Sequence, residues 1–575
     1  MVDPQVVLAE RVQRALAAAF GPEYADADPL IRPSQFADFQ ANVALSLAKR
    51  LRRAPRDVAQ ALVEHLDVAD VCANVEISGP GFVNLTLSDE WIAAQAATMR
   101  DDESLGVERR APQTVVVDYS APNAAKEMHV GHLRTTIVGD ALARVHEYLG
   151  DNVIRQNHLG DWGTPFGMLM EHLLDIGEEE ALRRLAAGDG NAFYQEARAK
   201  FDSDPAFEER ARRRVPLLQG GDPESMRLWH EFIEHTKRYF NRVYAQLGVT
   251  LTDEHIAGES MYNPWLADVC DELERTGVAV LSEGALCVFP PGFTGRDDKP
   301  LPLIIRKSDG GYGYATTDMA AIRYRVRDLK ADRILYVVGA TQALHFQMIF
   351  AAARMAGWLP DDVQAEHVQI GNVLGSDGKL FRTRSGKSIK LTELLDEAVE
   401  RAEAVLADRD YDAETRAQIA RQVGMGAVKY ADLSVSHDSE YVFDFDRMLA
   451  LTGNTGPYLQ YATARIRSIF RKGGLDPEQA KGRIVPSEPA ERALALTLLG
   501  FPAVVEKVAE ASEPHRLCAY LFDLAQAFTG FYESCPVLTA EDEAVRESRL
   551  ALSALTLRVL LQGLNLLGIE VPERM

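Results

Sequence analysis

Two histidines and a lysine in one loop are the residues of this sequence best suited to chemistry. His129 and His132 lie three positions apart, with Gly131 between them and Lys126 just upstream. Residues three apart at the start of a helix share one face, and the free main-chain N–H groups there attract phosphate. Gly131 leaves room for a flat base or ribose to approach the main chain. The loop therefore predicts phosphate or nucleotide chemistry.

Two other interpretations of the histidine pair stay open at this point. The pair could ligate a metal ion, or both rings could be buried and hydrogen-bonded in the core. A zinc site needs further ligands, and the sequence has no C-x-x-C or similar cluster to supply them. We therefore expect no zinc and no other metal site.

The segments around this loop predict a doubly wound parallel sheet. Two strand–helix–strand units are expected, one at 114–120, 132–149 and 152–159, the other at 333–340, 343–356 and 367–374. Such sheets bind ligands outside the carboxyl ends of the strands, where the strand order reverses. The loops after Ser120, Leu159 and Ala340 are therefore the expected positions of the site.

Three domains are expected along the chain. Residues 1–110 combine helices with a hairpin around 79–81 and form an N-terminal α+β domain, residues 111–420 hold the sheet, and residues 421–575 are all-helical. Within the sheet domain, about 171–300 is too long for a loop. Its charged and mostly helical pattern predicts an inserted helical subdomain.

The composition is typical of an acidic, globular protein of a reducing compartment. The 575 residues carry a formal net charge of −23, so a nucleic acid must be bound by local basic patches. Five scattered cysteines are typical of reduced thiols, and no segment has the length and hydropathy of a membrane span. We expect a cytoplasmic protein with no membrane contact, and we expect a monomer.

Several segments, in order along the chain, resemble one enzyme family. DYSAPNAAKEMHVGHLRTTIVGD, residues 118–140, resembles the signature loop of class I aminoacyl-tRNA synthetases, in detail that of arginyl-tRNA synthetases. The resemblance runs nearly end to end through SGPGFVNLTLS, NHLGDWGTPFGML, GESMYN, YGYATTDMA and LLGIEVPERM. It implies a Rossmann-like catalytic domain, an N-terminal domain that binds the tRNA elbow, and a helical C-terminal domain that reads the anticodon.

The activity implied by the resemblance is a two-step ligation. L-arginine attacks the α-phosphate of ATP to give arginyl-adenylate and pyrophosphate, and the arginyl group then passes to the terminal adenosine of tRNA(Arg). Mg²⁺ is carried with ATP. The alternatives are a synthetase for another amino acid, an adenylate-forming ligase that needs no tRNA, and a non-catalytic tRNA-binding paralogue.

The resemblance also assigns the residues that contact ATP. The catalytic set is Lys126, His129, His132 and Lys379. The ATP-binding set is His129, Gly131, His132, His345, Arg382 and Arg384. The second signature of the class, a mobile K-M-S-K-like loop, reads GSDGKLFRTRSGKS at 375–388 and lacks the usual lysine pattern. Lys126 is implied to compensate, and Lys379 could instead be a solvated turn residue.

The arginine pocket and the tRNA surface are assigned in the same way. A guanidinium has five N–H donors and no acceptor, so its pocket should present carboxylates, other acceptors and an aromatic wall. The matching residues are Ser120, Asn123, Glu259, Tyr314, Asp318 and Gln342. Cations and stackable rings suit anticodon bases, although a basic helix face is also an ordinary solvated surface. The tRNA set is Arg465, Arg467, Arg471, Lys472 and Tyr461, with Phe82 and Asn84 at the tips of the N-terminal hairpin.

Overall fold

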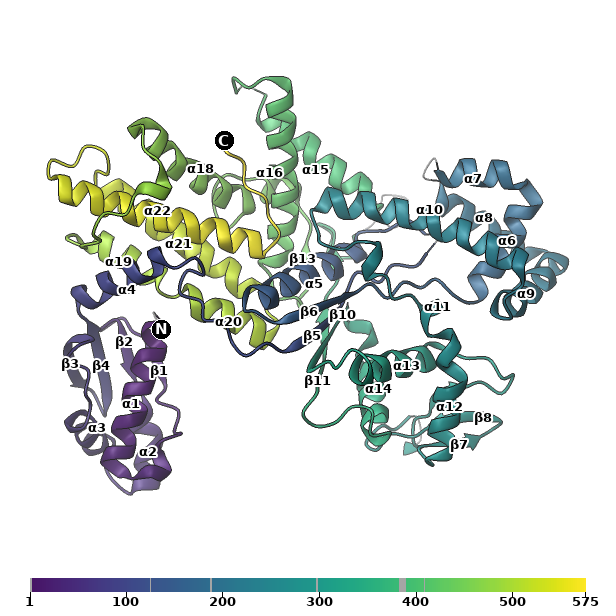
Figure 1. Cartoon of the computed structure of the whole chain (residues 1–575), viewed down its shortest axis with the longest axis horizontal. Helices are drawn as coiled ribbons and strands as arrows, with labels where there is room; N and C mark the ends of the chain where they lie inside the picture. Colours follow the sequence, from purple (N-terminus) through teal and green to yellow (C-terminus); the bar gives the residue numbers. More distant parts are fainter. Residues whose placement is uncertain (1–2, 125, 187–188, 296–297, 382–388, 408) are drawn as a thin grey trace.

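The computed structural model describes residues 3–124, 126–186, 189–295, 298–381, 389–407 and 409–575. The N-terminal domain lies beside the C-terminal helices, and the central sheet lies between these helices and the inserted helices (Figure 1). No helix in the described ranges combines the length and the apolar composition that crossing a bilayer would require.

The N-terminal domain is an antiparallel sheet packed on helices. The sheet has the order β1-β2-β4-β3, formed by β1 (Ile31–Pro33), β2 (Phe39–Ala41), β3 (Cys72–Ser78) and β4 (Phe82–Leu87). The helices are α1 (Pro4–Phe20), α2 (Val43–Leu51), α3 (Pro55–Glu64) and α4 (Asp89–Asp101). β3 and β4 form the hairpin expected around Gly79–Gly81. Arg492 of the C-terminal helices pairs with Asp38 at 2.8 Å and Asp89 at 2.6 Å and so holds this domain in place.

The central sheet is parallel throughout, with the order β11-β10-β5-β6. Its strands are β5 (Thr114–Asp118), β6 (Asn152–Gln156), β10 (Arg333–Gly339) and β11 (Gln364–Ile370). The crossover helices are α5 (Gly131–Tyr148), α13 (Tyr314–Arg327) and α14 (Ala343–Met355). Valines of β5 contribute to the apolar clusters on both faces of the sheet, because Val115 and Val117 point one way and Val116 the other. Both predicted strand–helix–strand units are confirmed.

The inserted segment contains a helical part and a β part. The helices are α6 (Thr164–Ile176), α7 (Glu178–Ala186), α8 (Gly190–Ser203), α9 (Pro205–Gln219) and α10 (Pro223–Leu247). After α11 (Glu259–Tyr262) and α12 (Leu266–Arg275) come β7 (Ala279–Ser282), β8 (Ala285–Val288) and β9 (Leu303–Arg306), which form an antiparallel sheet. The expectation of a helical segment is wrong for these strands, which pack with α12 and α13 rather than with α6–α10. Their short apolar runs gain stability from that packing, which local periodicity does not reveal.

The C-terminal part is a helical bundle. Its helices are α16 (Ala413–Leu433), α17 (Phe445–Met448), α18 (Gly456–Gly473), α19 (Pro489–Leu498), α20 (Phe501–Ala511), α21 (His515–Ser534) and α22 (Glu543–Leu566). α15 (Leu391–Val405) leads into the bundle from the sheet domain. One two-residue strand, β13 (Tyr441–Val442), departs from the all-helical expectation and pairs with β12 (Val373–Leu374).

Candidate active site

The expected loops meet at the point where the strand order reverses. β5 and β10 are neighbours, with β6 outside β5 and β11 outside β10. Residues 119–132, here called the signature loop, follow β5. The turn at Ala340–Gln342 follows β10 and leads into α14, which carries His345. The sheet therefore places the loops that carry the predicted ATP residues side by side.

A buried hydrogen-bond network holds the start of the signature loop in an unusual backbone conformation. Ser120 and Ala121 have φ of 71° and 45°, a left-handed conformation that costs about 1 to 3 kcal/mol per non-glycine residue. Ala121 N donates to Asn157 Oδ1 at 3.0 Å. The Tyr244 hydroxyl of α10 lies 2.8 Å from Ser120 Oγ and accepts from Asn157 Nδ2 at 2.9 Å. These contacts offset the backbone strain.

The main chain fixes which nitrogen of each signature histidine carries the proton. Gly131 N donates to His129 Nδ1 at 3.0 Å, and His129 N donates to His132 Nδ1 at 3.1 Å. Each Nδ1 is therefore an acceptor without a hydrogen, and a neutral ring must carry its proton on Nε2. The two ring centroids are 4.1 Å apart. The pair thus offers two adjacent Nε2–H donors, which suits phosphate oxygens.

Burial and neighbouring positive charge keep both histidines neutral. Burial, with His129 beside it, lowers the pKa of His132 to about 3. Burial, with Lys126 nearby, also lowers the pKa of His129. Neutral rings at physiological pH act here as hydrogen-bond donors and not as cations or bases. Gly131 serves this arrangement in a way the sequence did not predict, because a Cβ there would lie 2.8 Å from His129 Cε1.

Lys126 and the two residues directly after the second signature loop, Ile389 and Lys390, contact the region around the histidines. Lys126 Nζ lies 4.2 Å from the centroid of the Tyr194 ring of α8. Lys126 also lines a cavity of about 660 Å³ against α10. After the second loop, Lys390 Nζ pairs with Glu127 at 3.0 Å, and Val130 N donates to Ile389 O. The chain directly after the second signature loop is therefore bonded to the first.

Acidic side chains gather where the arginine pocket is predicted. Burial, with the charges of Asp161 and Asp318 nearby, raises the pKa of Glu259 to about 8. Asp318 Oδ2 lies 2.6 Å from His345 Nε2. Asp161 accepts from Ser260 N and Oγ at 2.8 and 2.6 Å, which fixes it beside Glu259. A site that holds a carboxyl partly protonated for lack of a counter-charge is suited to a cationic ligand.

The other residues predicted to line the arginine pocket differ in how far their side chains are exposed to solvent. The Tyr314 ring is 76% exposed at the start of α13, and the Gln342 side chain is exposed on the turn after β10. Asn123 is exposed and lies against Gly160, where a Cβ would be 2.4 Å from Asn123 Oδ1. Ser120 is only 3% exposed and its hydroxyl is bonded to Tyr244 and Thr136, so the structure uses this side chain to position the loop.

The second signature loop is described only in part. Lys379 is exposed in a tight turn in which its main-chain N donates to Asp377 Oδ1 at 3.1 Å. This geometry agrees with the turn interpretation and leaves the ammonium in solvent. Arg382 and Arg384 lie outside the described residues.

Four residues of the predicted anticodon set share one groove. Tyr461, Arg465, Arg471 and Lys472 of α18 line a cavity of about 540 Å³ that also includes Tyr532. The Arg465 guanidinium lies 4.4 Å from the Tyr532 ring centroid. Arg467, the fifth member on α18, instead donates to Pro572 O at 2.9 Å and is turned toward the C-terminal residues.

The N-terminal members of the tRNA set have unequal access to solvent. Phe82 begins β4 directly after the turn and is half-buried. Asn84 lies within β4 and is 6% exposed, and its side chain bonds to Gln40 and Ser78. The prediction that Asn84 forms a hairpin tip is wrong, because its amide satisfies buried polar groups inside the sheet.

Sequence reasoning missed three residues that shape the site: Asp161, Tyr244 and Tyr239, whose hydroxyl accepts a hydrogen bond from Met128 N at 3.0 Å. Each acts across a long stretch of chain, so local spacing gave no signal for it. Asp161 belongs to the segment NHLGDWG, which follows a predicted strand. That position at the end of a strand was the one indication that Asp161 lies near the site. In the described ranges, no three His, Cys, Asp or Glu side chains come close enough together to hold a metal ion.

The fold and the site define a class I aminoacyl-tRNA synthetase. The family model "tRNA synthetases class I (R), catalytic domain" matches residues 95–445, "Arginyl tRNA synthetase N terminal domain" matches 7–87, and "DALR anticodon binding domain" matches 459–575. The chain belongs to the arginyl-tRNA synthetase family.

Known proteins resemble the chain over its full length. It is 68% identical to arginine–tRNA ligase of Thermobifida fusca, with 100% of both chains covered, and 52% identical to that of Frankia casuarinae, with 99% of both covered. Among solved structures, arginyl-tRNA synthetase of Plasmodium falciparum superposes with a TM-score of 0.85 at 29% identity, covering 99% of both chains. That of Thermus thermophilus gives a TM-score of 0.82 at 26% identity, covering 100% of both.

Proposed function

We propose that this chain activates L-arginine with ATP and transfers it to tRNA(Arg) through the residues described above. The observation that carries the proposal is a cluster of three acidic side chains, Glu259, Asp161 and Asp318, at the same end of the sheet as the paired Nε2–H donors of His129 and His132. The cluster suits the guanidinium, and the donors suit the triphosphate.

In the first step a carboxylate oxygen of arginine attacks the α-phosphorus of ATP, and the bond to the bridging oxygen breaks as pyrophosphate leaves. Negative charge grows on the phosphate oxygens, where His129, His132 and Lys126 stabilise it. In the second step a ribose hydroxyl of the terminal adenosine of tRNA attacks the arginyl carbonyl, and AMP leaves. Mg²⁺ enters as part of the ATP substrate, and no zinc takes part.

The alternatives are separated by arginine-dependent exchange between ATP and pyrophosphate, measured with and without tRNA and with lysine as a control. Exchange with arginine and not with lysine supports the proposed pocket. Exchange with another amino acid would identify a different synthetase, exchange that is indifferent to tRNA would favour a tRNA-free ligase, and binding of tRNA without any exchange would indicate a non-catalytic paralogue.

The place of action and the assembly state are further parts of the proposal. A cytoplasmic location is supported by the five cysteines, all of which are buried free thiols. We also propose that the protein is a monomer. Sedimentation of the purified protein with and without tRNA measures the assembly state.

Arginine binding should strengthen as the pH rises toward 8. Because the pKa of Glu259 is raised to about 8, this carboxyl is protonated below that pH and must lose its proton to pair with a guanidinium. KM for arginine is expected to rise about tenfold for each unit of pH below 8. Steady-state kinetics between pH 6 and 9 measure this, with KM for ATP as the internal control. Glu259→Gln should bind arginine weakly and lose the pH dependence, and a flat wild-type profile would remove Glu259 from the pocket.

Arg465→Ala should weaken tRNA binding and leave arginine binding unchanged. Arg465 and Tyr532 form a cation and ring pair in the groove, and each stacked or charged contact to single-stranded RNA contributes about 1 to 3 kcal/mol. We expect KM for tRNA to rise about 5- to 150-fold, with a shallower salt dependence. Arg516→Ala, which removes an exposed arginine of α21, is the matched control. Equal tRNA affinity of the two variants would show that the groove is an ordinary solvated surface.

A further inference from the structure

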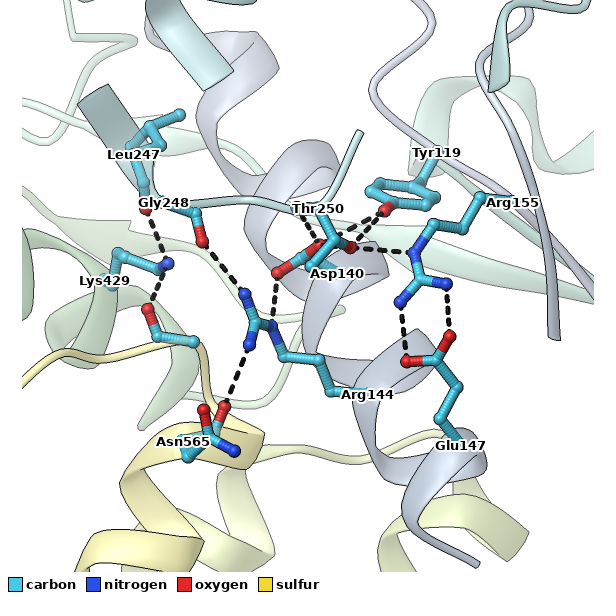
Figure 2. A network of polar contacts seen from close by, with 11 residues as sticks. Tyr119, Asp140, Arg144, Glu147, Arg155, Leu247, Gly248, Thr250, Lys429 and Asn565 are labelled. Carbon is cyan, nitrogen blue, oxygen red and sulfur yellow. Dashed lines mark hydrogen bonds and ion pairs between the residues drawn. The ribbon is translucent and has the colours of Figure 1, made fainter. Parts of the chain in front are cut away.

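A buried lysine joins the C-terminal domain to the inserted helices. Lys429 lies on α16 and is 1% exposed. Its ammonium donates to Leu247 O, at the end of α10, at 2.7 Å and to Gly568 O, just after α22, at 2.5 Å (Figure 2). Burial lowers the pKa of Lys429 to about 8. An apolar side chain would fill this position at a lower desolvation cost, so the ammonium indicates a requirement for its two carbonyl contacts.

The same end of α10 is also tied to the signature helix. Arg144 of α5 donates to Gly248 O at 3.0 Å and to Asp140 Oδ2 at 2.7 Å. Asp140 accepts from Thr250 N at 2.8 Å, and the Tyr119 hydroxyl lies 3.2 Å from its Oδ1 (Figure 2). The end of α10 is thus held between α5, which carries His132, and α16.

α10 in turn holds the signature loop at both ends. The Tyr244 hydroxyl contacts Ser120 Oγ at the start of the loop. The Tyr239 hydroxyl accepts from Met128 N at 3.0 Å, next to His129. Leu247 lies three residues after Tyr244, within one helical turn. A shift at the end of α10 would therefore reach the loop within one turn of the helix.

Beyond Gly568, the C-terminal residues lie along α18. Their main-chain oxygens accept hydrogen bonds from its side chains: Glu570 O from Gln460 at 2.7 Å, Pro572 O from Arg467 at 2.9 Å and Glu573 O from Arg471 at 3.3 Å. Arg471 also lines the groove predicted to bind the anticodon. A continuous path of contacts therefore runs from α18 through residues 568–573 and Lys429 to α10 and the signature loop.

We propose that Lys429 is a positioning residue that acts through α10 and couples tRNA bound at α18 to the placement of the signature loop. The inference rests on the proposed function of both sites and adds the connection between them. Coupling between two sites is reciprocal: tRNA should raise the affinity for arginine by the same factor by which arginine raises the affinity for tRNA. Such factors are typically about 5 to 150.

The test measures this factor in the full-length wild type and in Lys429→Met, with Lys507→Met on the exposed face of α20 as the control. Arginine affinity is measured with and without tRNA, and tRNA affinity with and without arginine and a non-hydrolysable ATP analogue. In the wild type and in Lys507→Met we expect a factor of at least about 5 in both directions. In Lys429→Met the factor should fall toward one, whereas general destabilisation would lower the affinities and not abolish their dependence on each other.

A second variant keeps the test decisive if Lys429→Met does not fold. Gln460→Leu removes the hydrogen bonds from α18 to Glu570 O at 2.7 Å and to Gln422 O of α16 at 2.9 Å, and it removes neither of the carbonyl groups that Lys429 contacts. It should also reduce the coupling factor, and the double variant should be no worse than the more severe single variant, because both residues lie on one path. A wild-type factor of one, or an unchanged factor in both variants, overturns the inference. Wild-type protein that gives no arginine-dependent exchange with tRNA contradicts the proposed function instead.

Discussion

Replacing Asp318 with asparagine is expected to weaken arginine binding about 30- to 4,000-fold, a loss of about 2 to 5 kcal/mol. The Asp318 carboxylate is 19% exposed, pairs with His345 at 2.6 Å and contributes to the field that raises the pKa of Glu259. Loss of its charge removes one of the carboxylates that we propose face the guanidinium. Desolvated charge pairs that lose one partner leave the other uncompensated, which accounts for the size of the effect.

Equilibrium binding of arginine and KM in the exchange reaction measure this loss, and KM for ATP should change little. Asp328→Asn, at the exposed end of the same helix, is the matched control. The Asn variant should also show a lower pKa for Glu259 in the pH profile of KM, because one neighbouring negative charge is gone. Normal arginine affinity in this variant would remove Asp318 from the pocket.

Lys126→Ala should lower kcat for adenylate formation about 10²- to 10³-fold with little change in KM for arginine. The ammonium lies in the signature loop three residues before His129, and in the structure it rests over the Tyr194 ring. A charge that acts on the triphosphate as pyrophosphate leaves contributes mainly in the transition state, so it affects kcat more than arginine binding.

Single-turnover formation of the adenylate measures the effect directly. Lys379→Ala is the informative comparison, because Lys379 lies in the described part of the second signature loop and is exposed there. A large loss in Lys126→Ala with a small one in Lys379→Ala would place the compensating charge in the first loop. The opposite result would place it in the second loop, and a normal kcat in Lys126→Ala would contradict the role proposed for Lys126.

Local sequence pattern predicted the parts of the fold that local forces determine. The strands at 114–118 and 333–339, the helix after the signature loop and the hairpin around Gly79–Gly81 follow from periodicity, β-branched runs and turn residues. The pairing of His129 with His132 follows from their spacing at a helix start. The doubly wound parallel arrangement also followed from the two strand–helix–strand units, because such units join parallel strands of one sheet.

Features that depend on distant parts of the chain were not predicted. Asp161 and Glu259 are brought together by Asn157 and Ala257, which pair across about one hundred residues of inserted chain. The β7–β9 sheet forms because α12 and α13 cover it. Asn84 can be buried because Gln40 of a neighbouring strand donates a hydrogen bond to its side-chain oxygen. The tautomers of the histidines depend on main-chain geometry that residue types do not encode.

The hydrogen bonds that α18 and Lys429 donate to the C-terminal residues all end on main-chain oxygens, those of Gly568, Glu570, Pro572 and Glu573. The Glu573 carboxylate adds an exposed ion pair with Arg467 at 3.8 Å. Every residue type carries a main-chain oxygen, so substitutions among the last three of these residues should be tolerated. Gly568 is the exception, because φ is +67° there and a Cβ would lie 2.8 Å from Lys429 Nζ. Insertion or deletion of one residue would move every later oxygen out of register. This segment is therefore constrained in its length far more than in its composition.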